Sequence, residues 1–288
     1  MSAVAARWRP DLGVLLVAPA AIFVVLFFVY PFAYGFWLSF TPAEGGWLAN
    51  YEKFFSDSHL WRTLIITFQL SLPVTILNVA LALPIAFQLR RKTRYQRFVT
   101  TLLVVPITLG TVLIAEGMLT YFGPRGWLSQ FLQLLHIYDG PIRLTHNFIG
   151  VVISLVISGF PFAFLLILSY VTGIDPTLAR AAATLGAGPW AQFRHIYLPL
   201  LAPGLAITFC LAFVQAFSVF PSAVLVGAPS GPTRVISLAA YEAAFEQYDY
   251  SMASTVAMIM GFAQLVVVII VLASRNAFYR GPVTGAKG

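Results

Sequence analysis

The chain has 288 residues, 59% of them hydrophobic and 9% charged, and its mean hydropathy is +0.86. A soluble domain carries charges on about a quarter of its residues, so this chain has too few charges to cover a globular surface in water. The composition excludes an ordinary soluble protein and predicts an all-α, polytopic membrane protein, whose length is counted in membrane spans.

The net charge is +7 and the isoelectric point is about 9.7. A basic chain can bind nucleic acid, but a membrane protein acquires the same excess from the basic residues of its cytoplasmic loops. We expect the second explanation and no nucleic acid partner. The single cysteine, Cys210, excludes an internal disulfide and is expected to be a buried thiol.

Six apolar segments are long enough to cross a bilayer core, which takes roughly 20 helical residues. They are Leu12–Phe40, Thr63–Leu89, Phe98–Phe122, Phe148–Val171, Pro203–Leu225 and Ser251–Ala273. The first follows Arg7 and Arg9 as in a signal peptide, but its apolar run is too long for a cleaved signal, so we expect an uncleaved span. The expected organisation is a tail at 1–11, a membrane domain at 12–275 and a tail at 276–288.

The basic residues are distributed unevenly between the two sides of these spans. Twelve of the 17 lie in the N-terminus, the 90–97 loop, the 173–202 loop and the C-terminal tail: Arg7, Arg9, Arg90, Arg91, Lys92, Arg94, Arg97, Arg180, Arg194, Arg275, Arg280 and Lys287. The other three connections hold five basic residues and seven of the ten acids. Because basic residues accumulate on the cytoplasmic side, both termini and the 173–202 loop are predicted to be cytoplasmic.

Glu116 is the only acid inside an expected span. A carboxylate in lipid is costly, so it is either a structural acid that is protonated or paired, or the lining of a polar route across the membrane that attracts a cation. Tyr121 and Gln215 are further candidates for such a route. However, lone amides such as Gln215 and Gln264 more commonly link one helix to another.

The 173–202 segment is predicted to form two short helices at an angle. Asp175 is suited to cap the first helix, and the Gly-Ala-Gly-Pro sequence at 186–189 ends it. The second helix, Trp190–Tyr197, is expected to stop at Leu198-Pro199. The apolar side chains on these helices are Leu178, Leu185, Trp190, Phe193 and Ile196. Such helices either lie on the membrane surface or dock on a partner, and helix physics alone does not choose between the two.

The same segment resembles the cytoplasmic loop shared by the permease subunits of bacterial ABC importers. That loop has the pattern Glu-Ala-Ala, three residues, Gly, nine residues, Ile-x-Leu-Pro. Its matched positions here are Ala181, Ala182, Gly186, Ile196, Leu198 and Pro199. The resemblance implies six transmembrane helices, with a coupling loop between helices four and five that docks into a groove of a separate ATPase subunit. The coupling residues that it implies are Leu178, Arg180, Ala181, Ala182, Leu185, Gly186, Trp190, Phe193, Ile196, Leu198 and Pro199.

Arg180 departs from this pattern, which has glutamate at that position. The reversed charge puts the polar contact of that glutamate in doubt but leaves the apolar docking surface in place. A solvent-exposed ion pair is worth roughly 0–1 kcal/mol, whereas a buried anchor residue at an interface can be worth about 2 kcal/mol or more. We therefore expect Arg180 at the rim of the groove, where it faces an acid of the ATPase or water.

Residues 123–132 and 138–143 look like the connection between the third and fourth spans of polyamine-type permeases. The resemblance implies a polyamine or a related small organic solute as substrate, while sugars, phosphonates and other oxyanions stay open. The rival class is an ion-coupled secondary transporter. It would be expected to carry several intramembrane charges and often an inverted repeat, whereas this sequence has one such acid and no convincing repeat.

The resemblance also implies a bacterial inner membrane location and three kinds of protein partner. These are a dimer of ABC ATPase subunits, a second homologous permease subunit or a second copy of this chain, and an extracytoplasmic substrate-binding protein. No Gly-x-x-x-x-Gly-Lys-Ser/Thr sequence occurs, so ATP is expected to act on the partner and this chain to bind no cofactor. The four histidines lack metal-ligand spacing and no Gly-x-Ser-x-Gly occurs, so we expect neither a metal site nor enzyme activity.

Overall fold

A computed structural model describes residues 12–91, 93–124, 126–135 and 144–278, and these residues form helices and connections without a strand. The predicted tail at 1–11 and most of the C-terminal tail, 279–288, lie outside the described residues. So does the 138–143 stretch that carried part of the polyamine resemblance.

Six helices in the described part of the chain are long and apolar enough to cross a membrane, which confirms the predicted all-α fold. They cover Leu16–Leu38, Ser58–Gln88, Arg94–Leu134, Phe148–Thr172, Pro189–Phe217 and Tyr250–Ser274. Their elements are α1 (Leu12–Val24), α2 (Tyr30–Leu38), α4 (Ser58–Gln88), α5 (Arg94–Phe122), α6 (Trp127–Leu134), α7 (Phe148–Thr172), α9 (Pro189–Gln192), α10 (Leu198–Phe217) and α13 (Tyr250–Phe278). The connections hold α3 (Ala49–Ser56), α8 (Pro176–Thr184), α11 (Pro221–Leu225) and α12 (Ile236–Tyr241).

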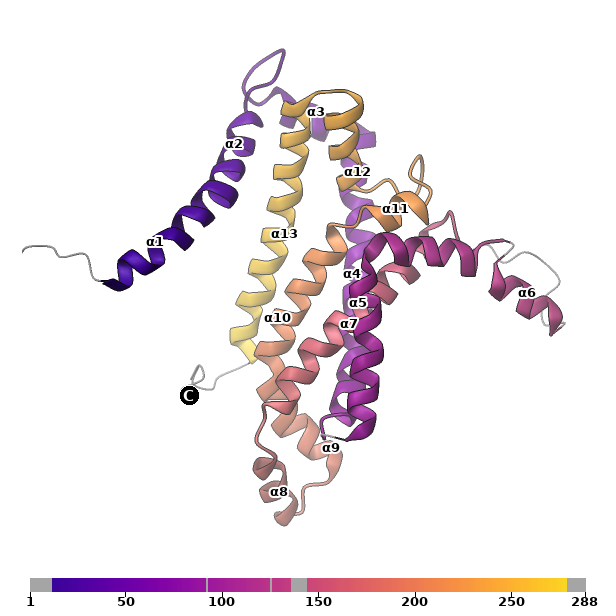
Figure 1. Cartoon of the computed structure of the whole chain (residues 1–288). Coiled ribbons are helices and arrows are strands. Elements are labelled where there is room, and N and C mark those ends of the chain that lie inside the picture. Colours follow the sequence, from indigo (N-terminus) through magenta and orange to yellow (C-terminus); the bar gives the residue numbers. More distant parts are fainter. Residues whose placement is uncertain (1–11, 92, 125, 136–143, 279–288) are drawn as a thin grey trace, which may run out of the picture.

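The centre of the bundle is formed by α4, α7 and α10, which pack against one another along their lengths (Figure 1). Phe164 and Ile167 of α7 are fully buried, and Leu201 of α10 joins their cluster. Closer to the other end, Phe213 and Phe217 of α10 are buried against α13. The outward faces of these helices are apolar and exposed, as a lipid-facing surface requires.

A row of small polar side chains on α4 faces the bundle. Thr63, Thr67, Ser71 and Thr75 follow one another at intervals of four residues, and all are buried. The hydroxyl of Thr75 donates to the Ser71 carbonyl at 2.7 Å, and the Thr67 hydroxyl accepts from the Ile236 amide at 2.9 Å. Small polar residues of this kind let membrane helices approach closely and supply bonds that lipid cannot.

The first span stands apart from the bundle. Figure 1 shows α2 near the upper end of α13, while α1 leans away from it. None of the most hydrophobic stretch of Leu16–Leu38 is buried within the chain. The single chain therefore leaves this helix to lipid or to another subunit.

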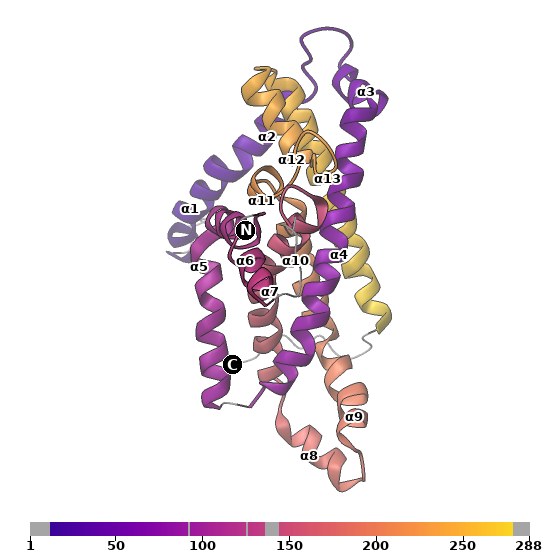
Figure 2. The same ribbon diagram turned by 90° about the vertical axis from the view of Figure 1, so that its right-hand side faces the viewer.

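The third span was predicted as one segment, but α5 bends sharply at Gly110. This residue has φ 72° and ψ 167°, a conformation that glycine adopts without the steric cost of a side chain. Pro106 lies one turn earlier and lacks the amide that a regular helix would use there. Beyond the bend, the chain through α6 leaves the line of the bundle, as both views show (Figures 1 and 2).

Candidate functional site

The helix α8 begins where the sequence predicted, at a capped turn outside the membrane spans. The carboxylate of Asp175 accepts a hydrogen bond from the Thr177 amide at 2.8 Å, and Pro176 occupies the first turn. Hydrogen bonds from the Thr177 amide and hydroxyl, with a smaller effect of the Arg180 charge, lower the pKa of Asp175. The carboxylate is thus ionised at neutral pH, and its stabilising effect on α8 is lost only when acidification passes the lowered pKa.

Gly186 reverses the chain after α8, which confirms the predicted turn. Its φ is 84°, and its amide donates to the Ala183 carbonyl at 3.0 Å. The Ala187 amide donates to the Ala182 carbonyl at 3.0 Å, so the two bonds complete a Schellman motif. The side-chain amide of Gln192 then donates to the Ala187 carbonyl at 2.8 Å and braces the turn from the following helix.

The second helix does not stop at Leu198-Pro199, and that prediction was wrong. The helix continues from α9 through a π-helical turn, Phe193–Tyr197, into α10, so it is the N-terminal part of the fifth span. Proline has no amide to donate, and the wider π-helical turn just before it accommodates that loss without a break. A single helical element, Pro189–Phe217, therefore joins the loop to the centre of the bundle.

The predicted coupling residues divide into an exposed group and a packed group. Leu178, Leu185 and Trp190 have exposed fractions of 46%, 90% and 71%. Figures 1 and 2 show α8 as the part that projects farthest from the bundle on its side. These three side chains are the exposed apolar tip of the loop.

The packed group points the other way, toward the bundle. The ring of Phe193 meets the Phe87 ring of α4 edge-on, with centroids 4.8 Å apart, and Tyr197 meets the same ring at 4.9 Å. Ile196 is half-buried, whereas Leu198 and Pro199 are exposed at the start of α10. Phe193 thus holds the loop to the bundle and does not belong to its exposed tip.

Arg180 is exposed, and Ala181 and Ala182 follow it on α8. The arginine lines a hollow of about 670 Å³ between α8 and the C-terminal ends of α4 and α7.

The residues predicted for a substrate route lie on two helices. Glu116 and Tyr121 are exposed on the part of α5 beyond Gly110, and Gln215 is exposed on α10. Gln264 instead donates to the Ser218 hydroxyl at 2.9 Å, which confirms its predicted role as a link between helices.

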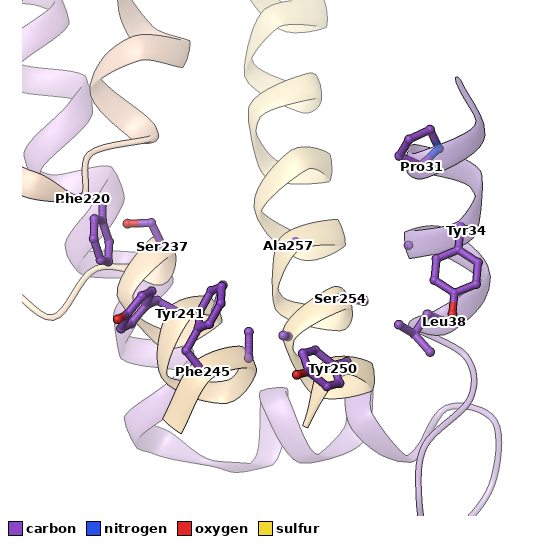
Figure 3. Close-up of a pocket in the computed structure, with 14 residues that line it drawn as sticks. Pro31, Tyr34, Leu38, Phe220, Ser237, Tyr241, Phe245, Tyr250, Ser254 and Ala257 are labelled. Carbon is purple, nitrogen blue, oxygen red and sulfur yellow. The ribbon is translucent and has the colours of Figure 1, made fainter. Parts of the chain in front are cut away.

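The sequence did not predict an apolar hollow of about 760 Å³ at the end of the bundle opposite the 173–202 loop. It lies between α2, α13 and α12 (Figure 3). Aromatic rings line it. The ring centroids of Phe220 and Tyr241 are 5.2 Å apart, and those of Tyr241 and Phe245 are 5.0 Å apart. The sequence signal for this hollow is the aromatic stretch at 241–250, which carries three tyrosines and a phenylalanine. Glu242 in the same stretch forms an ion pair with Arg234.

Comparison with known proteins found one family model, described as "Binding-protein-dependent transport system inner membrane component", that matches residues 78–281. The trehalose transport system permease protein SugA of Mycobacterium tuberculosis is 26% identical over 260 residues, covering 86% of this chain and 83% of SugA. The sn-glycerol-3-phosphate permease UgpA of Shigella flexneri is 27% identical over 277 residues, 92% of each chain.

Solved structures have the same fold. A crystal structure of a bacterial ABC transporter involved in the import of the acidic polysaccharide alginate matches with a TM-score of 0.79 and 20% identity, over 95% of this chain and 96% of that one. A chain of the MetNI methionine ABC transporter in an inward-facing conformation matches with a TM-score of 0.60 and 14% identity, over 78% of this chain and the whole of that one.

Proposed function

Because the matched family model covers most of the chain, this protein belongs to the binding-protein-dependent transport system inner membrane components, and we propose that it is the permease subunit of an ATP-driven ABC importer. In this role, it forms part of the substrate path and passes the movement of a separate ATPase to that path. The main support for the proposal is the structure of the loop 173–202. It has an exposed apolar tip and is continuous in helix with the fifth span.

The tip is suited to bind a protein. Leu178 and Leu185 are large apolar side chains outside the six long apolar helices, and Trp190 lies in the first turn of the fifth; their exposure to water would be unfavourable. A short helix that presents such residues is typical of docking into a groove, in which a few buried anchors supply most of the binding energy. We propose that the groove belongs to an ATPase subunit, since this chain has no phosphate-binding loop of its own.

The other proposed partners follow from the family and from the exposed first span. One alginate transporter structure contains a periplasmic protein with a bound alginate pentasaccharide, which supports an extracytoplasmic binding protein here too. The exposed helix Leu16–Leu38 and the part of α5 beyond Gly110 leave room for a second permease subunit, either homologous or identical, beside a dimer of ATPase subunits.

For the substrate, the relatives favour a polyhydroxylated solute over the polyamine that the sequence resemblance implied. The proteins in question are named for trehalose, starch degradation products and glycerol phosphate, and others are named for sulfate. We propose a sugar or a sugar-like phosphate ester, with other oxyanions as the second choice.

The proposed orientation places both termini and the 173–202 loop in the cytoplasm, on the evidence of the twelve-to-five distribution of basic residues. Lys53 and Gln247 line one small hollow at the end of the bundle where α4 begins, and the chain reaches Arg94 only after α4 ends. Single cysteines at Lys53 and Gln247 should react with a membrane-impermeant maleimide in intact spheroplasts. A cysteine at Arg94 should react only after lysis, and the opposite pattern would contradict the orientation.

Coupling through the loop should depend on the left-handed conformation of Gly186. Valine is strained at φ 84°, at a cost of roughly 1–2 kcal/mol, although a Cβ there would meet no neighbour within 4 Å. Gly186→Val should therefore tilt α8 and uncouple ATP hydrolysis from transport in reconstituted proteoliposomes.

Gly188→Val is the matched control. This glycine also has open space around it, but its φ is −68°. An extended backbone before proline suits valine, so the variant should stay coupled. Equal effects of the two substitutions would show that the geometry of the turn does not matter for coupling.

We propose that Glu116, exposed on the part of α5 beyond Gly110, lines the substrate path, and its substitution tests the substrate class. A hydroxyl-rich solute can donate to an amide oxygen as it does to a carboxylate, whereas a polyamine needs the charge. Glu116→Gln should thus retain more of the uptake of radiolabelled trehalose or glycerol 3-phosphate than Glu116→Leu does. The leucine variant removes the acceptor altogether and should lower uptake about tenfold or more, since a hydrogen bond to a charged group is worth about 1.5–3 kcal/mol. Uptake of spermidine that both variants abolish would favour a cationic substrate instead.

A further inference from the structure

The hollow beside Arg180 gathers positive charge from two separate parts of the fold. Arg90 and Arg91, at the end of α4, line it together with Arg180 of α8. Thr172 and Gln192 add a hydroxyl and an amide to its wall. A guanidinium group carries five N–H donors in a planar arrangement that matches the geometry of a carboxylate.

Arg90 is held against the wall of this hollow by the bundle itself. Its guanidinium lies 4.0 Å from the centre of the Phe87 ring and 5.4 Å from that of Tyr197, and its Nη1 donates to the Phe87 carbonyl at 2.7 Å. These contacts use one N–H donor and one face of the Arg90 guanidinium. The side chain is thereby already ordered, so its remaining donors can bind a ligand with little further loss of side-chain entropy.

The described part of the chain places no carboxylate in the wall of this hollow. Its one ion pair, Arg234–Glu242, lies at the opposite end of the bundle. Asp175 is the acid close to Arg180 in the sequence, but its carboxylate caps α8 through Thr177, and it does not line the hollow. Like charges that share a hollow repel one another, so the arrangement favours an anion between them.

We propose that the hollow formed by Arg90, Arg91 and Arg180 receives carboxylate side chains of the ATPase subunit. This inference rests on the proposed function. The hollow adjoins the exposed tip of the loop on the same short helix, so a protein that docks on Leu178 and Leu185 reaches the arginines along one continuous surface. Charge complementarity then fixes the rotation of the docked partner, while the apolar tip supplies most of the affinity.

The test is a binding titration with the full-length chain in nanodiscs of phosphatidylcholine alone, to which the purified ATPase subunit is added at low and at high sodium chloride. The double variant Arg91→Gln/Arg180→Gln should weaken binding about threefold to tenfold at low salt and should flatten its salt dependence, as for partly exposed ion pairs.

The matched control is Arg94→Gln/Arg97→Gln, which removes the same charge from exposed positions at the start of α5, outside the hollow. It should leave both the affinity and the salt dependence unchanged. Equal losses in the two double variants, or none in either, would overturn the inference. So would a salt dependence that appears only when phosphatidylglycerol is present, which would assign the hollow to lipid headgroups. A wild-type chain that does not bind the ATPase subunit at all would overturn the proposed function itself.

Discussion

The contact of Phe87 with Phe193 and Tyr197 joins the C-terminal end of α4 to the base of the loop 173–202, and the arrangement of this end of the bundle depends on it. The three rings fix the direction in which the helix Pro189–Phe217 leaves the bundle. They also provide the surface on which Arg90 rests. The Gly186 turn and the Gln192 side chain connect α8 to the same helix and set the angle between the two.

This geometry connects the loop mechanically to the centre of the bundle. A force applied at Leu185 reaches α9 through one glycine turn and then travels along a continuous helix into α10. Phe213 and Phe217 on α10 are buried against neighbouring helices, and protein interiors are packed too densely for such side chains to move independently. The fifth span is therefore expected to move together with the loop as one body.

The sequence predicted the features that local chemistry determines. The number of membrane spans followed from the lengths of the apolar segments. The start of α8 followed from Asp175 and Pro176, and the reversal of the chain after α8 followed from Gly186. It did not predict features that arise from packing between distant segments. The sequence predicts Phe193 as an exposed docking residue, because its contact with Phe87 of α4 is not visible from local sequence. The clustering of Arg90 with Arg180 likewise brings together positions far apart in the chain. The continuity through Leu198-Pro199 was missed because proline usually ends a helix, and the π-helical turn that accommodates it has no sequence signature of its own.

The central claim is that the loop and the fifth span move as a single body when the ATPase turns over. Electron paramagnetic resonance distances between spin labels test it most directly, with one label at Thr184 on α8, one at Leu211 on α10 and a third on the second permease subunit. With ATP bound, the Thr184–Leu211 distance should stay the same while the distance from Leu211 to the second subunit changes. A change within the chain, with the distance between subunits constant, would contradict the account.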